Sequence, residues 1–344
     1  MKPANRFLLA GDIGATKTTL ALYGAAVGLG IPLRQQTFPN ALFSSFDALL
    51  DKFLGQGPPA PVHACFGVAG PVTANSVRMT NLNWSIDGEE LRVRHGFQQV
   101  HLINDLVATA MGAIHLPAAD LSALNPGLAK VGEVMAVLAP GSGLGEAFLV
   151  PHHGAYHPYP SEGGHASFAP RDGRQLALLA FMLQRHAHVS VEMVCSGLAL
   201  PELFAFMSTQ YEAPAWLLGE LEQAVDRTPV IIRAALRAVQ GGRSCDIAVR
   251  TLELFIDILA DEAANLALKT WSLGGIFLGG GLTPRLVPFF KPERFMSVFA
   301  RGTYQDRLSR IPIHIIRNPL AALLGAAAYG AVVIGEKTPV PSVG

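Results

Sequence analysis

The sequence carries little charge and no excess of either sign. Of its 344 residues, 26 are Lys or Arg and 26 are Asp or Glu, so the formal net charge is zero. Chains that bind nucleic acid through electrostatic attraction are usually strongly basic, and this balance argues against that class. Half of the residues are hydrophobic and 15% are charged. This composition predicts a folded globular protein rather than a disordered one.

Cysteine and long hydrophobic runs are also scarce. The cysteines Cys65, Cys195 and Cys245 are far apart and form no CxxC pair, so neither a disulfide framework nor a structural zinc site is indicated. The first twelve residues lack the apolar core of a signal peptide. The uncharged stretch 319–335 is rich in Ala and Gly, and we interpret it as a close-packed helix in preference to a membrane span. We therefore expect a soluble cytoplasmic protein without a membrane partner.

Strand and helix patterns alternate along the chain, which predicts α/β layers. We expect strands at residues 6–11, 18–23, 33–38, 61–70, 76–80, 99–104, 133–141, 145–151, 276–278 and 311–316. We expect helices at residues 44–54, 87–96, 106–114, 173–186, 197–208, 214–225, 228–239, 245–271 and 319–333. The order strand, glycine-rich turn, strand occurs twice, in LLAGDIGATKTTLAL and in VLAPGSGLGEAFLV, which indicates an internal duplication. The stretch 117–132 is the best candidate for a domain boundary.

The first glycine-rich turn, GDIGATKT, has features of a phosphate-binding loop. A glycine turn between two strands leaves backbone N–H groups available to an anion, although neither a Walker loop nor a GxGxxG fingerprint is present. Asp12 would repel a phosphate unless a cation such as Mg²⁺ lay between them. Thr16 and Lys17 add a hydroxyl group and a positive charge. The alternative interpretation is an ordinary hairpin with Asp in its turn.

Two further glycine-rich segments occur later in the chain, APGSGLGEA at 139–147 and FLGGGLTPRL at 277–286. Glycine allows the backbone to approach a ligand closely. Two turns of the same type could hold a polyphosphate from both sides, and the three consecutive glycines could form a flat surface for a purine or a ribose. Taken singly, each segment is also compatible with a plain hairpin loop or a plain strand-to-helix connection.

Polar residues in SEGGHASF and SVEMVCSG are candidates for sugar binding. Carboxylates such as Glu162 and Glu192 accept hydrogen bonds from pairs of hydroxyl groups, and the imidazole of His165 can donate or accept. No HExxH spacing is present. The competing interpretation is a metal site made by His152, His153, His157, His165 and Glu162.

The segment HLIND places Asn104 and Asp105 at the end of an apolar strand. No Lys or Arg occurs between Gly96 and Ile114. A carboxylate at the carboxyl end of a strand in an α/β domain lies where ligand sites form. Asn or Asp also serves well as the N-cap of the helix that follows, and both interpretations can hold together.

The set of motifs, in its order along the chain, resembles that of the bacterial glucokinase family, which belongs to the hexokinase–actin–Hsp70 superfamily. The motifs are GDIGATKT, IND, APGSGLGEA, SEGGH, SVEMVCSG and LGGGL. The resemblance extends from about residue 6 to residue 330. It implies an α/β fold with two actin-like, ribonuclease-H-like domains flanking a deep cleft. The implied domains are residues 1–105 plus 318–344 and residues 106–317.

The resemblance also implies an activity, the transfer of the γ-phosphoryl group of ATP to the 6-hydroxyl group of glucose, with Asp105 as the general base. It assigns the sugar contacts to Asn104, Glu162, His165 and Glu192. It assigns the nucleotide contacts to Gly11, Asp12, Ile13, Gly14, Ala15, Thr16, Lys17, Gly141, Ser142, Gly143, Gly279, Gly280 and Gly281. ATP and Mg²⁺, with Mg²⁺ bound through water to Asp12, are the expected co-substrate and cofactor. A homodimer is compatible with the sequence.

The chain departs from the family pattern at two positions. Ala15 replaces a glycine that is usual in the first turn, and its methyl group would lie beside the β-phosphate. Glu146 follows the second turn where small apolar residues are common. A carboxylate that faced the nucleotide there would repel phosphate, so we expect Glu146 to face away from it.

Other activities remain alternatives at this point. The sugar contacts bind hydroxyl groups that several hexoses share, so a kinase of mannose or fructose fits the same residues. Polyphosphate is an alternative phosphoryl donor. A third interpretation is a non-catalytic sugar sensor, but no helix-turn-helix pattern precedes the first strand, and Asp105 would have no role in such a protein.

Overall fold

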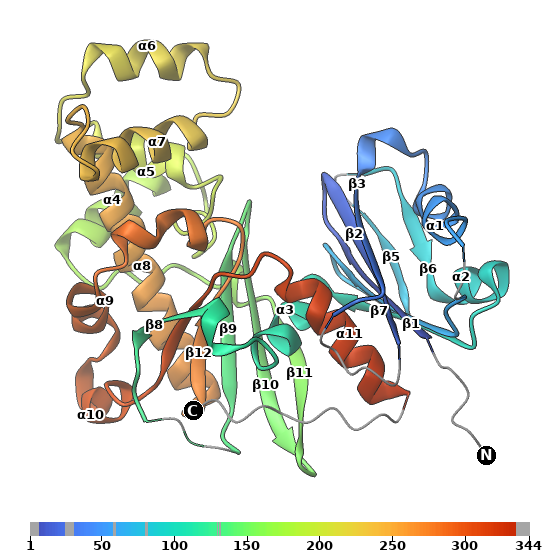
Figure 1. Ribbon diagram of the computed structural model, residues 1–344. Coiled ribbons are helices and arrows are strands. Elements are labelled where there is room, and N and C mark those ends of the chain that lie inside the picture. Colours follow the sequence, from blue (N-terminus) through green and yellow to red (C-terminus); the bar gives the residue numbers. More distant parts are fainter. Residues whose placement is uncertain are drawn as a thin grey trace. The chain divides into compact units, whose positions relative to one another are not determined.

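The computed structural model describes residues 7–24, 31–57, 60–79, 82–128, 130 and 132–334. Contacts divide the chain into two compact units (Figure 1). The first unit comprises residues 1–120, 149–160 and 318–344, and the second comprises residues 121–148 and 161–317. The domain limits derived from the resemblance, 1–105 plus 318–344 and 106–317, remain a proposal.

The first unit is built on a five-stranded sheet with the order β3-β2-β1-β4-β7. Its strands are β1 (Phe7–Ile13), β2 (Lys17–Gly24), β3 (Arg34–Pro39), β4 (His63–Val68) and β7 (Gln99–Asn104). Strands β1, β2 and β3 form an antiparallel meander, whereas β1, β4 and β7 run parallel. Strands β5 (Ser76–Arg78) and β6 (Ser85–Asp87) form a separate small sheet.

The helices of the first unit begin and end where the sequence places capping residues. They are α1 (Phe46–Leu54), α2 (Gly88–His95), α3 (Asp105–Ala113) and α11 (Ala321–Val333), with the short 3-10 helices η1 (Asn40–Leu42) and η2 (Ala118–Asp120). Ser45 caps α1 by accepting a hydrogen bond from Ala48 N–H, and Asp87 caps α2. Gly96 ends α2 at φ 71°, a left-handed conformation that favours glycine.

Helices α3 and α11 pack against each other at very short range, as the small residues of the predicted closing helix suggest. A methyl group on Gly325 would overlap the carbonyl oxygen of Ala108, and one on Gly112 would overlap that of Ala321. Together the two helices cover one face of the first sheet, and α11 contacts β1 and β4 directly (Figure 1). Among the described residues, no helix has both the length and the apolar character needed to cross a membrane.

The second unit contains most of a six-stranded sheet with the order β11-β10-β9-β12-β13-β8, although the contacts assign its residues 149–160, in β10 and β11, to the first unit. Its strands are β8 (Leu121–Asn125), β9 (Met135–Pro140), β10 (Leu144–His152), β11 (Ala155–Ser161), β12 (Gly275–Leu278) and β13 (Ile313–Ile316). Strands β9, β12 and β13 run parallel, and β8 is antiparallel to β13. The boundary between the units at residues 120 and 121 falls within the predicted boundary stretch 117–132, and β8, which lies in the same stretch, extends the sheet.

The strand orders of the two sheets support the internal duplication. In chain order, the third, second, first, fourth and fifth strands lie side by side in the first sheet as β3-β2-β1-β4-β7, and β11-β10-β9-β12-β13 repeats this arrangement. In both sheets the first strand of the repeat is parallel to the fourth. The two glycine-rich turns, β1 to β2 and β9 to β10, therefore occupy equivalent positions in their own sheets.

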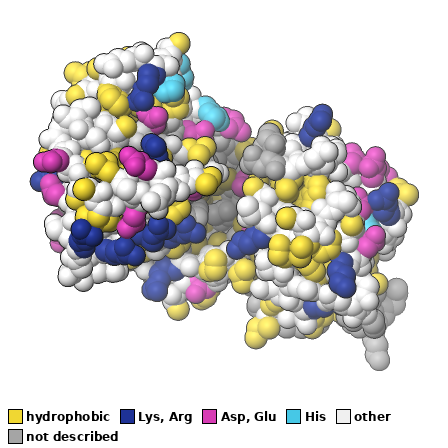
Figure 2. Space-filling view, turned by 90° about the horizontal axis from the view of Figure 1, so that it is seen from above, with side chains coloured by type: hydrophobic (Ala, Val, Ile, Leu, Met, Phe, Trp, Pro, Cys, Tyr) yellow, Lys and Arg dark blue, Asp and Glu magenta, His cyan; other side chains and the backbone are white. Residues whose placement is uncertain are grey.

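The helices of the second unit surround the long helix α8 (Asp246–Thr270), which carries much of the core. The others are α4 (Gly173–Leu183), α5 (Leu200–Met207), α6 (Ala215–Gln223), α7 (Thr228–Val239), α9 (Pro292–Phe299) and α10 (Gln305–Leu308), with the 3-10 helices η3 (Gly163–His165), η4 (Thr283–Phe289) and η5 (Gly302–Tyr304). Acidic and basic side chains both appear on the face shown in Figure 2.

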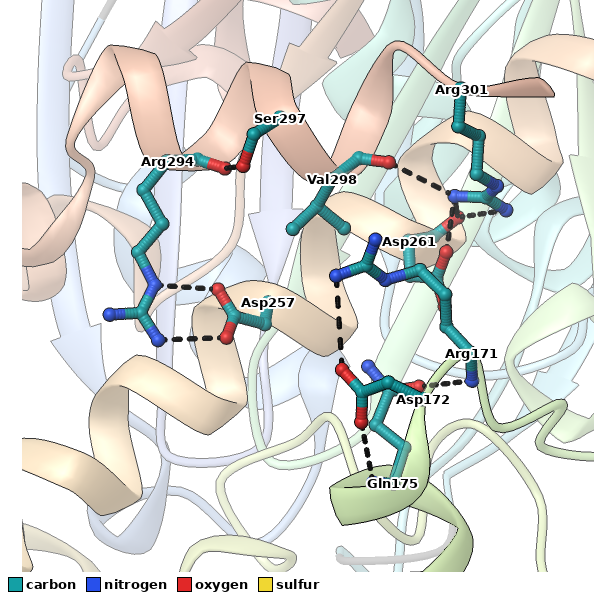
Figure 3. A network of polar contacts seen from close by, with 9 residues as sticks. All are labelled: Arg171, Asp172, Gln175, Asp257, Asp261, Arg294, Ser297, Val298 and Arg301. Carbon is teal, nitrogen blue, oxygen red and sulfur yellow. Dashed lines mark hydrogen bonds and ion pairs between the residues drawn. The ribbon is translucent and has the colours of Figure 1, made fainter.

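Ion pairs fasten the segment around α9 to α8 (Figure 3). Arg294 donates two hydrogen bonds of 2.8 Å to Asp257, and Arg301 pairs with Asp261, which is buried. A two-point contact between guanidinium and carboxylate fixes direction as well as distance. These pairs explain why α9, which the sequence did not predict, has a defined place on α8.

Candidate active site

In the first unit, three parallel strands end side by side. Ile13 of β1 is in register with Val68 of β4, and Val68 is in register with Asn104 of β7. Asp12 and Asp105 lie at this edge, one just before the end of β1 and the other just after β7. The carboxyl ends of parallel strands are where α/β folds form ligand sites.

A glycine makes room between these two acids. Gly67 is the register partner of Asp12, and its missing Cβ would lie 3.9 Å from the Cα atom of Asp105 and 2.9 Å from the Cβ atom of Ala108. The absence of a side chain at Gly67 thus lets the start of α3 approach the end of β1. The structure therefore brings Asp12 and Asp105 into the same part of the first unit.

Asn104 is the N-cap of α3, and Asp105 is its first residue. The Asn104 side-chain oxygen accepts hydrogen bonds from Leu106 N–H at 2.8 Å and Val107 N–H at 3.4 Å, and its amide donates to Gly70 O at 3.2 Å. The Asp105 carboxylate accepts from Leu106 N–H at 3.0 Å. A carboxylate in the first turn is also favoured by the helix dipole. The capping role proposed for this pair is therefore present, and it fixes the backbone that carries Asp105.

Asp12 is a half-buried carboxyl group in β1. Burial raises its pKa from the ordinary value of 3.8 to about 6, and the positive charge of Lys17 partly opposes the rise. A carboxylate whose charged form is penalised by burial gains from a nearby cation. Mg²⁺ is usually held by one or two carboxylates together with water and phosphate oxygens, and Asp12 fits such a donor set.

The first glycine turn, residues 14–17, is closed by a hydrogen bond of its own and is also hydrogen-bonded to a residue outside it. Gly14 N–H donates to Lys17 O at 3.0 Å, which closes the turn. Gly11 lies inside β1, where a Cβ atom would come within 2.6 Å of the Phe66 ring, so packing alone requires a glycine there. The side chain of Asn40, in η1, hydrogen-bonds to the turn from below the sheet edge. Asn40 belongs to no motif that was identified in the sequence.

In the second unit, the equivalent turn Gly141–Gly143 is bound to the segment that carries Glu192. Gly197 N–H donates to Gly141 O at 2.8 Å, and Leu198 N–H donates to Ser142 O at 3.3 Å. The Glu192 carboxylate accepts from Leu144 N–H at 2.8 Å. A methyl group on Gly143 would overlap Oε2 of Glu192, so glycine at this position leaves room for that carboxylate.

The three sugar-binding candidates of the second unit lie together. The ring of His165 has Nε2 3.8 Å from Glu162 Oε2 and Nδ1 3.9 Å from Glu192 Oε1. Glu162 and His165 are well exposed, whereas Glu192 is 30% exposed. Glu192 N–H donates to Gly164 O at 2.8 Å, which links the two segments. Two carboxylates around one imidazole offer acceptors and a donor to a set of hydroxyl groups.

The third glycine segment packs against the end of β9. Gly279 N–H donates to Leu138 O at 2.9 Å, and Leu282 N–H donates to Pro140 O at 3.2 Å. Gly280 has φ 80°, and a Cβ atom there would overlap Pro140 O. The buried hydroxyl of Thr283 donates to Gly279 O. Residues 279–281 therefore lie next to the turn 141–143 within the second unit, as a nucleotide site built from both requires.

Glu146 is buried beneath the sugar-binding candidates. It is 2% exposed, and a methyl group on Gly163 would overlap its Oε2. Burial, together with the negative charge of Glu262 and partly opposed by Lys269, raises the pKa of the Glu146 carboxyl from 4.5 to about 7. Within the described part of the chain, Glu146 Oε1 has no hydrogen-bond partner. The Glu146 carboxylate thus packs directly against Gly163 from the interior of the protein.

The competing metal interpretation finds no support in the described residues. No group of three or more His, Cys, Asp or Glu side chains there could hold a metal ion. His152, His153 and His157 do lie near one another, with ring centroids 3.9 Å apart for His152 and His153 and 5.9 Å apart for His152 and His157. They belong to β10, β11 and the turn between them, and the sugar-binding candidates belong to other elements.

The sequence profile of the family described as Glucokinase matches residues 9–332. The glucokinase of Nostoc punctiforme is 35% identical over 341 residues, covering 94% of this chain and 98% of that protein. The glucokinase of Trichormus variabilis is 36% identical over 342 residues, with the same shares covered. The match therefore extends across both units and all of the motifs.

Solved structures give the same result for the fold. The glucokinase of an Antarctic psychrotroph superposes with a TM-score of 0.82 at 31% identity, covering 96% of this chain and 100% of that one. A ROK family glucokinase from Streptomyces griseus, solved with glucose and AMPPNP, has a TM-score of 0.64 at 19% identity, covering 95% of this chain and 99% of that one. The predicted α/β fold class with actin-like domains is confirmed.

Proposed function

The chain belongs to the glucokinase family, and on this basis we propose that it transfers the γ-phosphoryl group of ATP to the 6-hydroxyl group of glucose. The observation that carries the proposal is the position of Glu192. Its carboxylate accepts a hydrogen bond from the residue that follows the second glycine turn, and it lies 3.9 Å from His165. A sugar-binding carboxylate is thereby attached to a phosphate-binding turn.

Asp105 is the proposed general base. A sugar hydroxyl is a poor nucleophile, and its proton must leave as the new bond to phosphorus forms. Phosphoryl transfer has a loose transition state, so positioning of the hydroxyl and stabilisation of charge supply most of the catalysis. Asp105 is fixed at the start of α3 by the Asn104 cap, and a fixed carboxylate can both orient the 6-hydroxyl group and accept its proton.

The two glycine turns are the proposed phosphate ligands. In the segments Gly11 to Lys17 of the first unit and Gly141 to Gly143 of the second, Gly14 N–H and Gly141 N–H are used inside the turns. The N–H groups at the turn tips, such as those of Ala15 and Ser142, would donate to phosphate oxygens. Asp12 would hold Mg²⁺ through water. When bound, Mg²⁺ neutralises phosphate charge, while Lys17, which is exposed beside the turn, adds a positive charge from the protein. Residues 279–281 offer the backbone surface for the adenosine.

Asn104, Glu162, His165 and Glu192 are the proposed glucose ligands. Buried or fixed polar groups that bond hydroxyls discriminate strongly against sugars that lack them, because the groups are then left unpaired. The amide of Asn104 keeps one N–H beyond the bond to Gly70 O. His165 lies between the two carboxylates, so its charge and tautomer set which hydroxyls each of the three can bond.

The test of this proposal is a coupled assay of the purified protein with ATP and Mg²⁺ against glucose, mannose and fructose, with polyphosphate as a second donor. We expect glucose with ATP to give the highest kcat/KM. Turnover of mannose or fructose with a higher kcat/KM would instead identify a kinase of that sugar, and sugar binding without turnover would identify a sensor. We place the enzyme in the cytoplasm, where ATP is available, and propose a homodimer, which light scattering would measure.

A further inference from the structure

Asn40 lies under the first glycine turn and is almost fully buried, with 1% of its surface exposed. It follows Pro39 at the start of η1, and its sequence context FPNAL predicts only a turn. A buried amide side chain is costly unless its donors and acceptor are paired. The hydrogen-bond partners of Asn40 therefore indicate its role.

All of these partners belong to the turn or to the strand that leaves it. Asn40 N–H donates to Thr16 O at 2.9 Å, and its side-chain Nδ2 donates to Gly14 O at 2.8 Å. Its Oδ1 accepts from the hydroxyl of Thr18 at 2.8 Å. Two of the carbonyl groups of the turn are therefore directed toward a single residue that lies 22 or more positions away in sequence.

The hydrogen bonds that orient the carbonyl groups of the turn also orient the N–H groups of the same peptide units. In a trans peptide the C=O and the following N–H point in opposite directions. Because Gly14 C=O points at Asn40, the N–H of Ala15 points away from it. Among the residues that the structure describes, neither Ala15 nor Thr16 donates its N–H to a protein acceptor. The N–H group of Ala15 is thus presented to an anion.

We propose that Asn40 is a positioning residue for phosphoryl transfer, which holds the first glycine turn so that the N–H group of Ala15 receives a nucleotide phosphate. This inference rests on the proposed function of the turn and deepens it. Asn40 itself is buried against the turn, and its part in the proposal is to position the turn. Its contribution is a fixed direction of the backbone dipoles, which costs no rearrangement when the phosphate arrives.

The test replaces Asn40 in two ways and measures kinetics against both substrates. Asn40→Ala removes the whole amide, and Asn40→Asp keeps an acceptor for Thr18 but loses the donor to Gly14 O. We expect the KM for ATP to rise about tenfold or kcat to fall by a similar factor, as loss of a buried hydrogen bond implies. The KM for glucose should stay within about twofold, because no sugar candidate contacts Asn40.

A matched control separates positioning from general stability. Thr37→Val removes the 3.0 Å hydrogen bond between Thr19 of β2 and Thr37 of β3, which does not involve the turn. It should leave the KM for ATP unchanged. Thr18→Val keeps Asn40 but removes the hydroxyl that orients its amide, and should raise the KM for ATP by about threefold. Melting temperatures for all variants show whether each is folded.

Two outcomes would overturn the inference. One is folded Asn40 variants with the KM and kcat of the parent protein. The other is an equal loss of affinity for ATP and glucose, which indicates a structural role alone. Calorimetric titration with ATP and Mg²⁺ tests the inference without turnover: if the parent protein binds ATP but phosphorylates no hexose, the proposed function fails, while weaker ATP binding by Asn40→Ala still supports the role of Asn40.

Discussion

The Glu192 carboxylate accepts a hydrogen bond of 2.8 Å from the backbone N–H of Leu144. This contact makes the conformation of the second glycine turn and the position of a proposed glucose ligand depend on each other. It also explains why position 143 is glycine, since any side chain there would displace the carboxylate. The resulting coupling between turn and sugar ligand can be tested by adding a single methyl group.

Gly143→Ala should weaken glucose binding. The new methyl group would overlap Oε2 of Glu192, so the carboxylate must move away from Leu144 and His165. We expect the KM for glucose to rise about tenfold or more, and Glu192→Ala to have an effect of the same kind. Steady-state kinetics with varied glucose measure this. Gly141→Ala is the matched control for sugar affinity, because no atom lies within 4 Å of a Cβ at that position. If the KM for glucose were unchanged in Gly143→Ala, the proposed role of Glu192 would be contradicted.

Asp105→Asn should remove the proton acceptor and keep the shape of the side chain. We expect kcat to fall by about 10²–10⁴-fold, the usual contribution of a general base. Glucose affinity, measured by titration in the absence of ATP, should stay near that of the parent protein. Because the Asn side chain can still accept from Leu106 N–H, α3 should keep its start. Turnover close to that of the parent protein would exclude Asp105 from proton transfer.

Glu146→Gln should make stability less sensitive to pH. The folded protein holds the Glu146 proton up to a pKa of about 7, whereas the unfolded chain releases it near 4.5. Between these values the folded state binds more protons, so the unfolding free energy of the parent protein falls as pH rises. Relative to the parent, Glu146→Gln should therefore gain about 2 kcal/mol between pH 5.5 and pH 8.

Urea unfolding at the two pH values measures this difference. The neighbouring charges of Glu262 and Lys269 remain in both proteins, so the comparison isolates Glu146. Parallel pH profiles for the variant and the parent protein would show that Glu146 is already ionised in the fold.

Gly325→Ala should destabilise the first unit. The added methyl group would overlap the carbonyl oxygen of Ala108 across the contact between α11 and α3, and overpacking of this kind costs about 1–3 kcal/mol or more. Thermal unfolding should show a lower Tm. Gly219→Ala in α6 is the matched control, since a Cβ there meets no atom within 4 Å and alanine favours a helix by about 0.5–1 kcal/mol. Equal melting temperatures for the two variants would be incompatible with the close approach of α3 and α11.

Hydrophobic periodicity was sufficient to predict most of the elements. The strand 99–104 and the helix 228–239 were predicted with the bounds that the structure shows. The strand β11 was missed because AYHPYPS is mostly polar and contains two prolines. It lies at the edge of its sheet, where a missing N–H is tolerated, and such strands carry little of the alternation that buried strands show.

The positions of the candidate site residues were predictable where these residues are close together in sequence or stand at the ends of strands. Asp12, Asn104 and Asp105 stand at strand ends that the pattern identifies, and Glu162 and His165 lie in one short segment. The role of Asn40 was not predictable, because its partners are residues 14–18 and only the meander of β1, β2 and β3 brings them to it. The interior position of Glu146 likewise depends on Gly163, which the fold places against it.

The packing of α11 on the first sheet has a consequence for how the protein is made. Leu8 and Cys65 share a core cluster with Leu323 and Ala327, so an apolar face made early in synthesis is completely covered only when a helix made near its end is added. At the ribosome's rate of roughly 5–20 residues per second, Leu8 leaves about 15–60 s before Leu323. During this interval the nascent chain exposes an apolar surface. We expect molecular chaperones to bind this surface until the last helix has been synthesised.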